Sequence, residues 1–495
     1  MKIIRIKSII LGFFLSISLM GCDDLERFPN DAIEQSQSFQ TLQDAATWNN
    51  GLYAAMRGAV YGPFMFTTDI QADQLNATLD YGNRNGNPHR WEGFLADDGA
   101  LSTLWSAYYF RIRDINAALE GFENIDVTPE ETSSLELYRA EAYLARAFYY
   151  HNLVVRFAPN YDPSSASSDL GVPLVLEFDI TERPARNTVE EVYQQILSDI
   201  EKARPALSQV SGEQGAYRFN IDVLTALEAR VKLHMEDWEG AKLAADKLIA
   251  SGRYPLIDNQ EQFTDMWTTG YDQEVIMNLF VSAPNELANT NSIYLGYNGA
   301  TNRFTPDFLP SQWVIDLYEE DDIRRDAYFS DNDTIEISGV TYTDLTLVNK
   351  YPGNPEFFTG ANTNYQHEPI VFRIAELYLI SAEAGLNLPD VNSALNVLNE
   401  LRVSRGLDAL DSSDDLVNSI MEERTRELAF EGFRLDDLRR WDMGFTRREP
   451  QNTLPLVQGD NFYTKSVEAS NPKFIWGIPT NDITINDNLE QNPGW

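Results

Sequence analysis

Cysteine is almost absent from this chain, which holds a single one, Cys22, among its 495 residues. No disulfide can form within the chain, so a hydrophobic core must supply its stability, and the chain is long enough to build one. Histidine is also scarce, and the sequence contains neither a His-Glu-x-x-His pattern nor a nucleophile elbow nor a phosphate-binding loop. These absences favour a protein that binds over one that catalyses, and we expect no enzyme, no catalytic residue and no metal site.

Basic residues are few, with 38 Lys and Arg against 76 Asp and Glu, and the formal net charge is −38. Such a surface repels phosphate backbones and anionic lipid. We therefore expect no nucleic-acid partner, and contact with a membrane only through a lipid anchor.

Long apolar runs are absent beyond the first 21 residues. That first stretch has a basic start and an apolar centre too short to span a bilayer, and it ends in Leu-Met-Gly before Cys22. We interpret residues 1–21 as a signal peptide, Cys22 as the lipidation site and residues 22–38 as a lipidated tether. The alternative is a plain signal peptide followed by an incidental cysteine.

The remaining chain, residues 39–495, has helical periodicity and no linker that would divide it. Apolar residues recur at helical spacing over 137–155 and 192–203, over 224–231 and 238–249, and over 377–386 and 394–401. Thr188 and Glu191 form a capping box before the second of these segments. Small residues on several of them allow close helix contact, as in tetratricopeptide hairpins. We predict a mostly α, single large domain with tetratricopeptide-like hairpins at about 137–250 and 373–402, the alternative being ordinary helical hairpins.

Several separated segments, in order, resemble the SusD/RagB family of outer-membrane lipoproteins. They are FQTLQDAA with NGLY near residue 50, RAEAYLARAFYY at 139–150, GVPL at 171–174, RNTVEEVY at 186–193, RTRELAFEGFRLDDLRRW at 424–441 and LEQNPGW at 489–495. We interpret the 424–441 motif as structural, because its alternating acidic and basic residues can form a dense network of ion pairs.

The resemblance implies a nutrient-binding lid on a SusC-like TonB-dependent transporter of the outer membrane. Asp23 and Asp24 resemble the signal that sends such lipoproteins to the outer face, although they could also be a plain acidic spacer. The function expected is capture of a polysaccharide or oligosaccharide at the cell surface and its delivery to that transporter. A peptide-binding import lipoprotein of the RagB kind and a surface glycosidase remain alternatives.

Two long stretches rich in Asn, Gly and aromatic residues, 73–99 and 255–311, are the candidate ligand loops, because sugars are held by aromatic faces and by polar groups that reach their hydroxyls. The first offers Trp91 and Tyr81 as stacking platforms, with Asn83, Arg84, Asn85 and His89. The second offers Trp267, Tyr271, Tyr294, Tyr297, Asn298 and Arg303. The alternative is that Trp91 and Trp267 pack against the scaffold. No cofactor is expected, apart from a structural calcium ion that the acidic run at 319–322 could hold.

Overall fold

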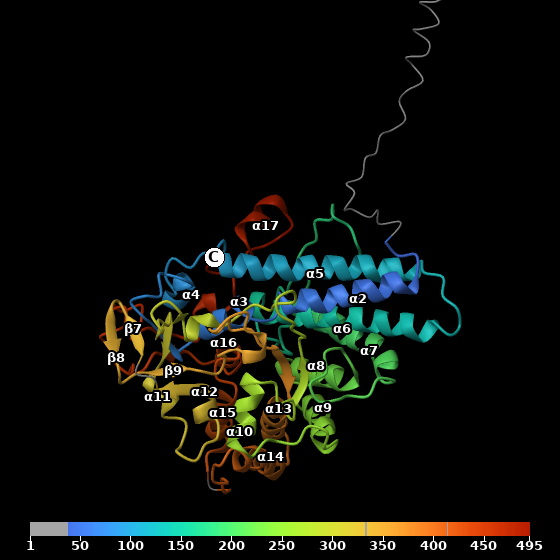
Figure 1. Cartoon of the computed structure of the whole chain (residues 1–495). Coiled ribbons are helices and arrows are strands. Elements are labelled where there is room, and N and C mark those ends of the chain that lie inside the picture. The colour runs from blue at the N-terminus through green and yellow to red at the C-terminus, as the bar shows by residue number, and fades with distance from the viewer. Residues whose placement is uncertain (1–37, 332–333, 413) are drawn as a thin grey trace, which may run out of the picture.

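The computed structural model describes residues 38–331, 334–412 and 414–495 (Figure 1). The predicted signal peptide, Cys22 and nearly all of the predicted tether lie outside these residues. The predicted fold class, a mostly α single domain, is confirmed. Within the described ranges, no helix is both long enough and apolar enough to cross a membrane.

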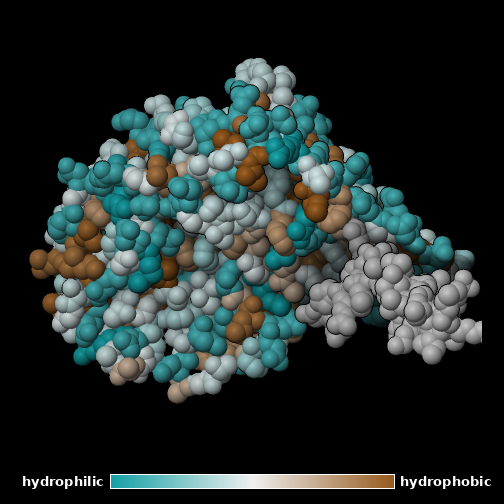
Figure 2. All heavy atoms as spheres, turned by 90° about the horizontal axis from the view of Figure 1, so that it is seen from above, coloured by the Kyte–Doolittle hydropathy of each residue, from teal (hydrophilic) through white to brown (hydrophobic). Residues whose placement is uncertain are grey.

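Three helices run side by side along the upper face in Figure 1: α2 (Leu42–Arg57), α5 (Gly99–Glu123) and α6 (Thr132–Phe157). Thr41 begins α2 through a capping box, in which its hydroxyl accepts from the Asp44 amide and the Asp44 carboxylate accepts from the Thr41 amide. Viewed from above, this face is largely hydrophilic with scattered apolar side chains (Figure 2). Along the chain, α2 is followed by α3 (Pro63–Gln71), β1 (Leu75–Ala77) and α4 (Gly86–Arg90) before α5 begins.

The predicted helix pairs are present and form what we call the hairpin array. Its pairs are α6 with α7 (Val189–Leu207), α8 (Ile221–His234) with α9 (Trp238–Ala250), and α13 (Ile374–Leu386) with α14 (Val391–Ser404). Thr188 caps α7 as the sequence predicts. A Cβ at Gly385 would lie 3.2 Å from the Ala394 Cβ, so small residues do permit close contact between α13 and α14. Because α13 packs on α9, the array is continuous across more than a hundred residues of intervening chain.

That intervening chain, residues 251–373, is the inserted segment. Short elements alternate along it: α10 (Gln260–Thr268), β2 (Val275–Asn278), the 3-10 helix η2 (Ser292–Tyr294), β3 (Tyr297–Asn298), β4 (Arg303–Phe304), β5 (Phe308–Pro310), α11 (Gln312–Ile315), α12 (Arg325–Tyr328), β6 (Phe329–Asp331), β7 (Ile335–Ile337), β8 (Val340–Tyr342), β9 (Thr346–Val348), the 3-10 helix η3 (Pro355–Phe357) and β10 (Ile370–Arg373). The strands form a small sheet in the order β3-β4-β7-β8 and the antiparallel pairs β1-β5, β10-β2 and β6-β9.

The chain ends with elements that pack back on the body. They are α15 (Leu416–Glu427), α16 (Arg434–Arg440), β11 (Phe445–Thr446), β12 (Ser466–Val467), the 3-10 helix η4 (Pro472–Phe474) and α17 (Thr480–Ile485). The terminal Trp495 packs edge-on against Phe94, with ring centroids 4.9 Å apart, and its indole N–H donates to the Ile475 carbonyl at 2.8 Å. The C-terminal motif is therefore a packed tail.

The hairpin array and the inserted segment have separate apolar cores. Buried ion pairs lie where these two parts of the protein meet. One core joins the hairpin array to α2 and α5, and another joins α3 to the inserted segment. At the junction, Glu427 of α15 is fully buried and accepts from Arg324, Arg373 and Arg405. The predicted ion pairs of the 424–441 motif are present, and they reach far beyond their own helix.

Candidate functional site

The first predicted ligand loop is tightly folded. Trp91 is only 7% exposed, because its ring packs against Phe445 and Phe474 while its N–H donates to the Gln71 carbonyl at 2.7 Å. His89 is fully buried, and burial together with nearby Arg447 holds its pKa well below the ordinary value. This placement favours the alternative reading of Trp91, a ring that packs against the scaffold.

The polar residues of this loop differ in exposure. Tyr81 is 8% exposed, and its hydroxyl donates to Asn83 and accepts from Arg90. Asn83 and Arg84 are exposed and Asn85 is half-buried. The Arg84 guanidinium pairs with Asp307 through its Nε at 2.6 Å, and this bond raises the arginine pKa. Asn83 and Arg84 are thus the members of this set that a ligand can reach most freely.

The second predicted set is not gathered in one place. Trp267 and Tyr294 are 3% and 1% exposed and belong to the core of the inserted segment. Tyr271 is half-buried just after α10, where its hydroxyl donates to Gln273 at 2.9 Å. Tyr297, Asn298 and Arg303 lie together on the β3-β4 hairpin, in which Asn298 pairs with Arg303. Only this hairpin trio presents a shared accessible surface.

An open groove of about 640 Å³ lies beside these loops, and we call it the aromatic groove. One wall is α11, with Gln312 and Trp313, and the following Asp316, and the other is formed by the chain at 447–450 and 463–464. The Gln312 amide donates to the Glu449 carbonyl and so joins the two walls, while the Arg447 amide donates to the Lys465 carbonyl and joins the two segments of the second wall.

The half-buried Trp313 ring is fixed in orientation on the α11 wall. Its N–H points to the Asp73 carbonyl at 3.4 Å, and the guanidinium carbon of Arg448 lies 5.1 Å from the ring centroid. Gln312 donates to Asp316 at 2.8 Å, so an amide and a carboxylate stand together beside the ring. Tyr463 faces the same groove and is half-buried. The arrangement offers aromatic surface next to hydroxyl-binding groups.

Arg447, on the second wall of the groove, is buried against α3. It is 2% exposed and donates to the carbonyls of Ile70, Gln71 and Ala72, at the C-terminal end of α3. A cation at that end is stabilised by the helix dipole and satisfies carbonyls that have no partner in the helix. Burial nevertheless lowers the pKa of Arg447 to about 9. Arg447 therefore joins the groove to α3.

Trp313 and Tyr463 are not among the ligand contacts that the sequence predicts. The second Asn- and aromatic-rich stretch ends at residue 311, and Trp313 follows within the apolar pattern of a short helix, where a buried role is the ordinary expectation. Tyr463 is more than a hundred residues from Trp313 in the sequence. It lies beside α11 only because the tertiary fold brings the two segments together.

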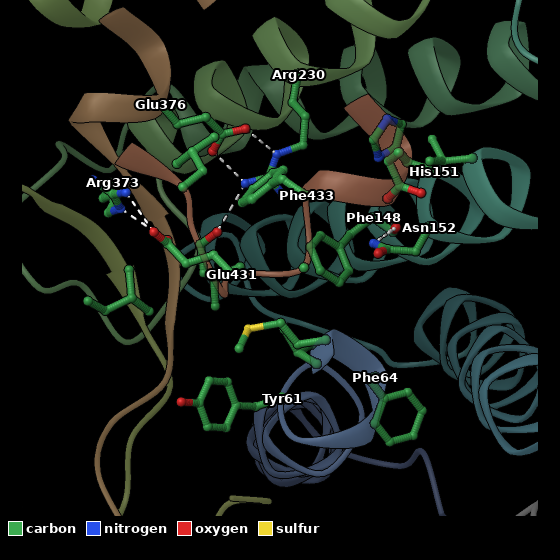
Figure 3. Close-up of a pocket in the computed structure, with 18 of the residues that line it drawn as sticks. Tyr61, Phe64, Phe148, His151, Asn152, Arg230, Arg373, Glu376, Glu431 and Phe433 are labelled. Carbon is green, nitrogen blue, oxygen red and sulfur yellow. Dashed lines mark hydrogen bonds and ion pairs between the residues drawn. The ribbon is translucent and has the colours of Figure 1, made fainter. Parts of the chain in front are cut away.

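A second cavity, which we call the central cleft, lies between the hairpin array, α3 and the inserted segment (Figure 3). Its volume is about 100 Å³, too small for a glycan chain. Tyr61 and Phe64 line one side, across from Phe148 and Glu431.

The predicted calcium position does not gather ligands. Asp322, the last residue of the acidic run, is 3% exposed, and both of its carboxylate oxygens accept from Arg324. Across the described ranges, no cluster of three or more His, Cys, Asp or Glu side chains is arranged to hold a metal ion.

Comparisons with known proteins agree on one family. Residues 297–495 match the model of the SusD family, and residues 25–233 match a model described as starch-binding associating with outer membrane. SusD-like protein P38 of Formosa agariphila is 24% identical over 99% of both chains.

Solved structures share the fold. A SusD superfamily protein of Bacteroides thetaiotaomicron aligns with a TM-score of 0.78 and 24% identity, over 92% of this chain and all of that one. A laminarin-binding SusD-like protein aligns with a TM-score of 0.70 and 21% identity, again over 92% of this chain and all of its own. With family models matching both halves of the sequence, this chain belongs to the SusD family.

Proposed function

We propose that this protein is a lipid-anchored glycan-binding protein of the cell surface, which captures a polysaccharide or oligosaccharide and delivers it to a SusC-like TonB-dependent transporter. The observation that carries the proposal is the aromatic groove, where Trp313 and Tyr463 stand beside Gln312, Asp316 and Arg448.

The chemistry of the groove suits a neutral glycan. Sugar rings present flat C–H faces that pack on aromatic rings, while their hydroxyls both donate and accept hydrogen bonds. Amide, carboxylate and guanidinium groups beside Trp313 supply both functions. The net charge of −38 disfavours strongly anionic polymers. The family description as starch-binding and the laminarin-binding structural neighbour support the same ligand class.

Asn83 and Arg84 are proposed as outlying contacts. Phe462, the residue before Tyr463, packs against Tyr81 with ring centroids 6.2 Å apart, so the first predicted loop borders the groove. Tyr297, Asn298 and Arg303 on the β3-β4 hairpin are retained as a second candidate surface for a long chain.

Binding to a panel of neutral polysaccharides, measured by affinity electrophoresis and calorimetry, tests the ligand class. Trp313→Ala should weaken glycan binding by about tenfold, which corresponds to about 1.4 kcal/mol. The matched control is Phe110→Ala, which removes an aromatic ring 52% exposed on α5 and should leave affinity unchanged. Equal affinity of both variants would remove Trp313 from the site. Binding of oligopeptides alone would favour the peptide-import alternative, and release of reducing ends would favour the glycosidase.

The anchor and the transporter need separate tests. Cys22→Ala should leave glycan binding by the released protein intact and abolish its retention in the outer-membrane fraction, and unchanged retention would contradict the lipidation site. Co-purification of the wild-type protein with a TonB-dependent transporter from detergent-solubilised outer membranes is the expected result for the partnership, and purification without one would contradict it.

A further inference from the structure

Three aromatic side chains of the described residues stand out by their exposure. Phe110, Phe280 and Tyr217 are 52%, 46% and 39% exposed. Phe110 lies beside the guanidinium of Arg113 on α5, whereas Phe280 and Tyr217 contact each other, with ring centroids 5.4 Å apart and ring planes at 82°. We call this pair the aromatic platform. It is separate from the aromatic groove, which has neither ring in its lining.

The platform stands at one end of the small sheet that contains β2. Ala216 pairs with β2 on one side, and on the other side Pro369, just before β10, accepts from the Leu279 amide at 3.0 Å. The residues next to these contacts along the three segments are Tyr217, Glu368 and Phe280. Three paired segments that are distant in sequence therefore bring two rings and a carboxylate together.

Hydrogen bonds fix both parts of the platform in place. The Tyr217 hydroxyl donates to the Glu368 carboxylate, whose two oxygens lie 2.8 and 2.9 Å away. The Phe280 carbonyl accepts from Arg57 at 2.6 Å, and the Arg57 side chain in turn pairs with Glu286 at 2.9 Å. A ligand would therefore meet a preformed surface, and little conformational entropy of the protein would be lost on binding.

Carboxylates border the platform. Burial raises the pKa of Tyr217 and of Glu368, and the nearby Asp272 charge adds to both effects. Asp272 itself accepts from the Asn278 amide at 2.8 Å. A carboxylate has about four acceptor positions, so Glu368 and Asp272 can also accept from the hydroxyls of a ligand. The same two groups repel an anionic ligand.

The size of the platform favours a sugar over a protein as its occupant. At these exposures the two side chains present roughly 200 Å² of surface between them. A stable protein interface takes about 800 Å² from each partner, so two rings are too small a patch to hold a protein. They match one or two pyranose rings, whose C–H faces pack on aromatic rings.

We infer that the aromatic platform is a second glycan-binding surface of this protein, which holds one or two neutral pyranose units separately from the aromatic groove. The sugar packs on Phe280 and Tyr217, and its hydroxyls donate to Glu368 and Asp272. The inference rests on the proposed ligand class, a neutral glycan, but it does not rest on the groove. A long chain held at both surfaces gains affinity from the high effective concentration of its second segment, whereas a chain too short to reach both does not.

Affinity electrophoresis of the full-length protein, in gels that contain neutral polysaccharides such as soluble starch and laminarin, measures the binding of long chains. Phe280→Ala should weaken this binding by about fivefold, because one of two contact surfaces is lost. Phe110→Ala is the matched control, since it removes a ring of similar exposure from another part of the surface, and it should bind as wild type does. Calorimetry with the hexasaccharide of a polymer that binds, such as maltohexaose for starch, counts the short chains. Wild type should bind two and Phe280→Ala one.

A second platform variant, Tyr217→Ala, should lose polysaccharide affinity to a similar extent, and thermal unfolding establishes that each variant is folded. The inference is overturned if wild type binds a single hexasaccharide, or if both platform variants bind the polysaccharide as wild type does. Binding of trilysine that is lost in Phe280→Ala, with glycan binding unchanged, would also overturn it, because the platform would then be a site for basic side chains.

Failure of the proposed function gives a different result. Wild type would then bind none of the neutral polysaccharides, and the platform inference would fall with it. Normal binding of a polysaccharide by Phe280→Ala and Tyr217→Ala, together with weakened binding by Trp313→Ala, would overturn the platform and leave the proposed function in place. Partial loss in Trp313→Ala and in Phe280→Ala, with a greater loss in the double variant, is the result expected if both surfaces bind glycan.

Discussion

The hairpin array and the inserted segment obtain their structure in different ways. Within each hairpin the array helices pack on their neighbours in sequence, as α6 does on α7 and α8 on α9, and α13 packs on α9 across the inserted segment. Strands of the inserted segment find distant partners: Leu75 of β1 pairs with Pro310 of β5, and Ile370 of β10 pairs with Asn278 of β2. The array is therefore specified by local apolar periodicity, while the inserted segment depends on contacts that exist only in the folded chain.

Buried charge marks the junction between the two parts. Glu427 accepts from Arg405, the residue that follows α14, at 2.9 Å and from Arg324 of the inserted segment at 2.8 Å. Burial alone would raise the pKa of Glu427, but the surrounding Arg405, Arg373 and Arg324 hold it well below its ordinary value. Ion pairs around Glu427 therefore join the two parts, each of which has its own apolar core.

The largest expected effect is at this junction. Glu427→Gln should lower the free energy of unfolding by about 3–5 kcal/mol, because it leaves buried guanidiniums without their counter-charge. Urea unfolding measures the change. The control, Glu422→Gln, removes a carboxylate that is 55% exposed in its ion pair with Arg426, and it should cost less than about 1 kcal/mol. Similar losses in both variants would mean that the junction is held by apolar packing.

Within the array, apolar packing contributes to stability beside buried ion pairs such as that of Arg146 with Asp199. Ile196 of α7 is fully buried, and Ile196→Ala should lower the free energy of unfolding by about 3 kcal/mol through lost burial and the cavity left behind. Leu243 of α9 is 71% exposed, so Leu243→Ala should change it by less than about 0.5 kcal/mol. Urea unfolding compares the pair, and a cost for Ile196→Ala below 1 kcal/mol would show that the array relaxes around the cavity.

The difference between local and long-range contacts explains which features could be predicted from the sequence. Helix periodicity and the Thr188 capping box locate the array helices, since both signals lie within one stretch of chain. The candidate ligand residues fared differently, because aromatic composition does not distinguish an exposed ring from a buried one. Trp91 and Trp267 are buried by Phe474 and Tyr351, which are distant in sequence, while Trp313 is placed in a groove by a wall from residues 447–464. The position of a ring relative to solvent is a tertiary property.

Lys350 offers a pH-dependent test of the inserted segment. It is fully buried, bonded to the Ala429 carbonyl and to Glu431, and burial lowers its pKa to about 7. Because the unfolded chain holds this proton up to about pH 10, it binds more protons than the folded protein between about pH 7 and 9.5. Stability should therefore rise with pH there, by at most about 1.4 kcal/mol per unit. Lys350→Met should flatten the slope in urea unfolding at pH 7, 8 and 9, and parallel slopes would contradict the lowered pKa.

The smallest effect is expected at the capping box of α7, which is one of the local signals that predicted the array. The Thr188 hydroxyl accepts from the Glu191 amide at 3.2 Å, and the Glu191 carboxylate accepts from the Thr188 amide at 2.9 Å. Thr188→Ala should lower the free energy of unfolding by about 1 kcal/mol, since one amide at the start of α7 loses its partner. Thr453→Ala, at an exposed position outside the helices, is the control and should have no measurable effect. If Thr188→Ala also had no measurable effect, the capping box would mark where α7 begins without stabilising it.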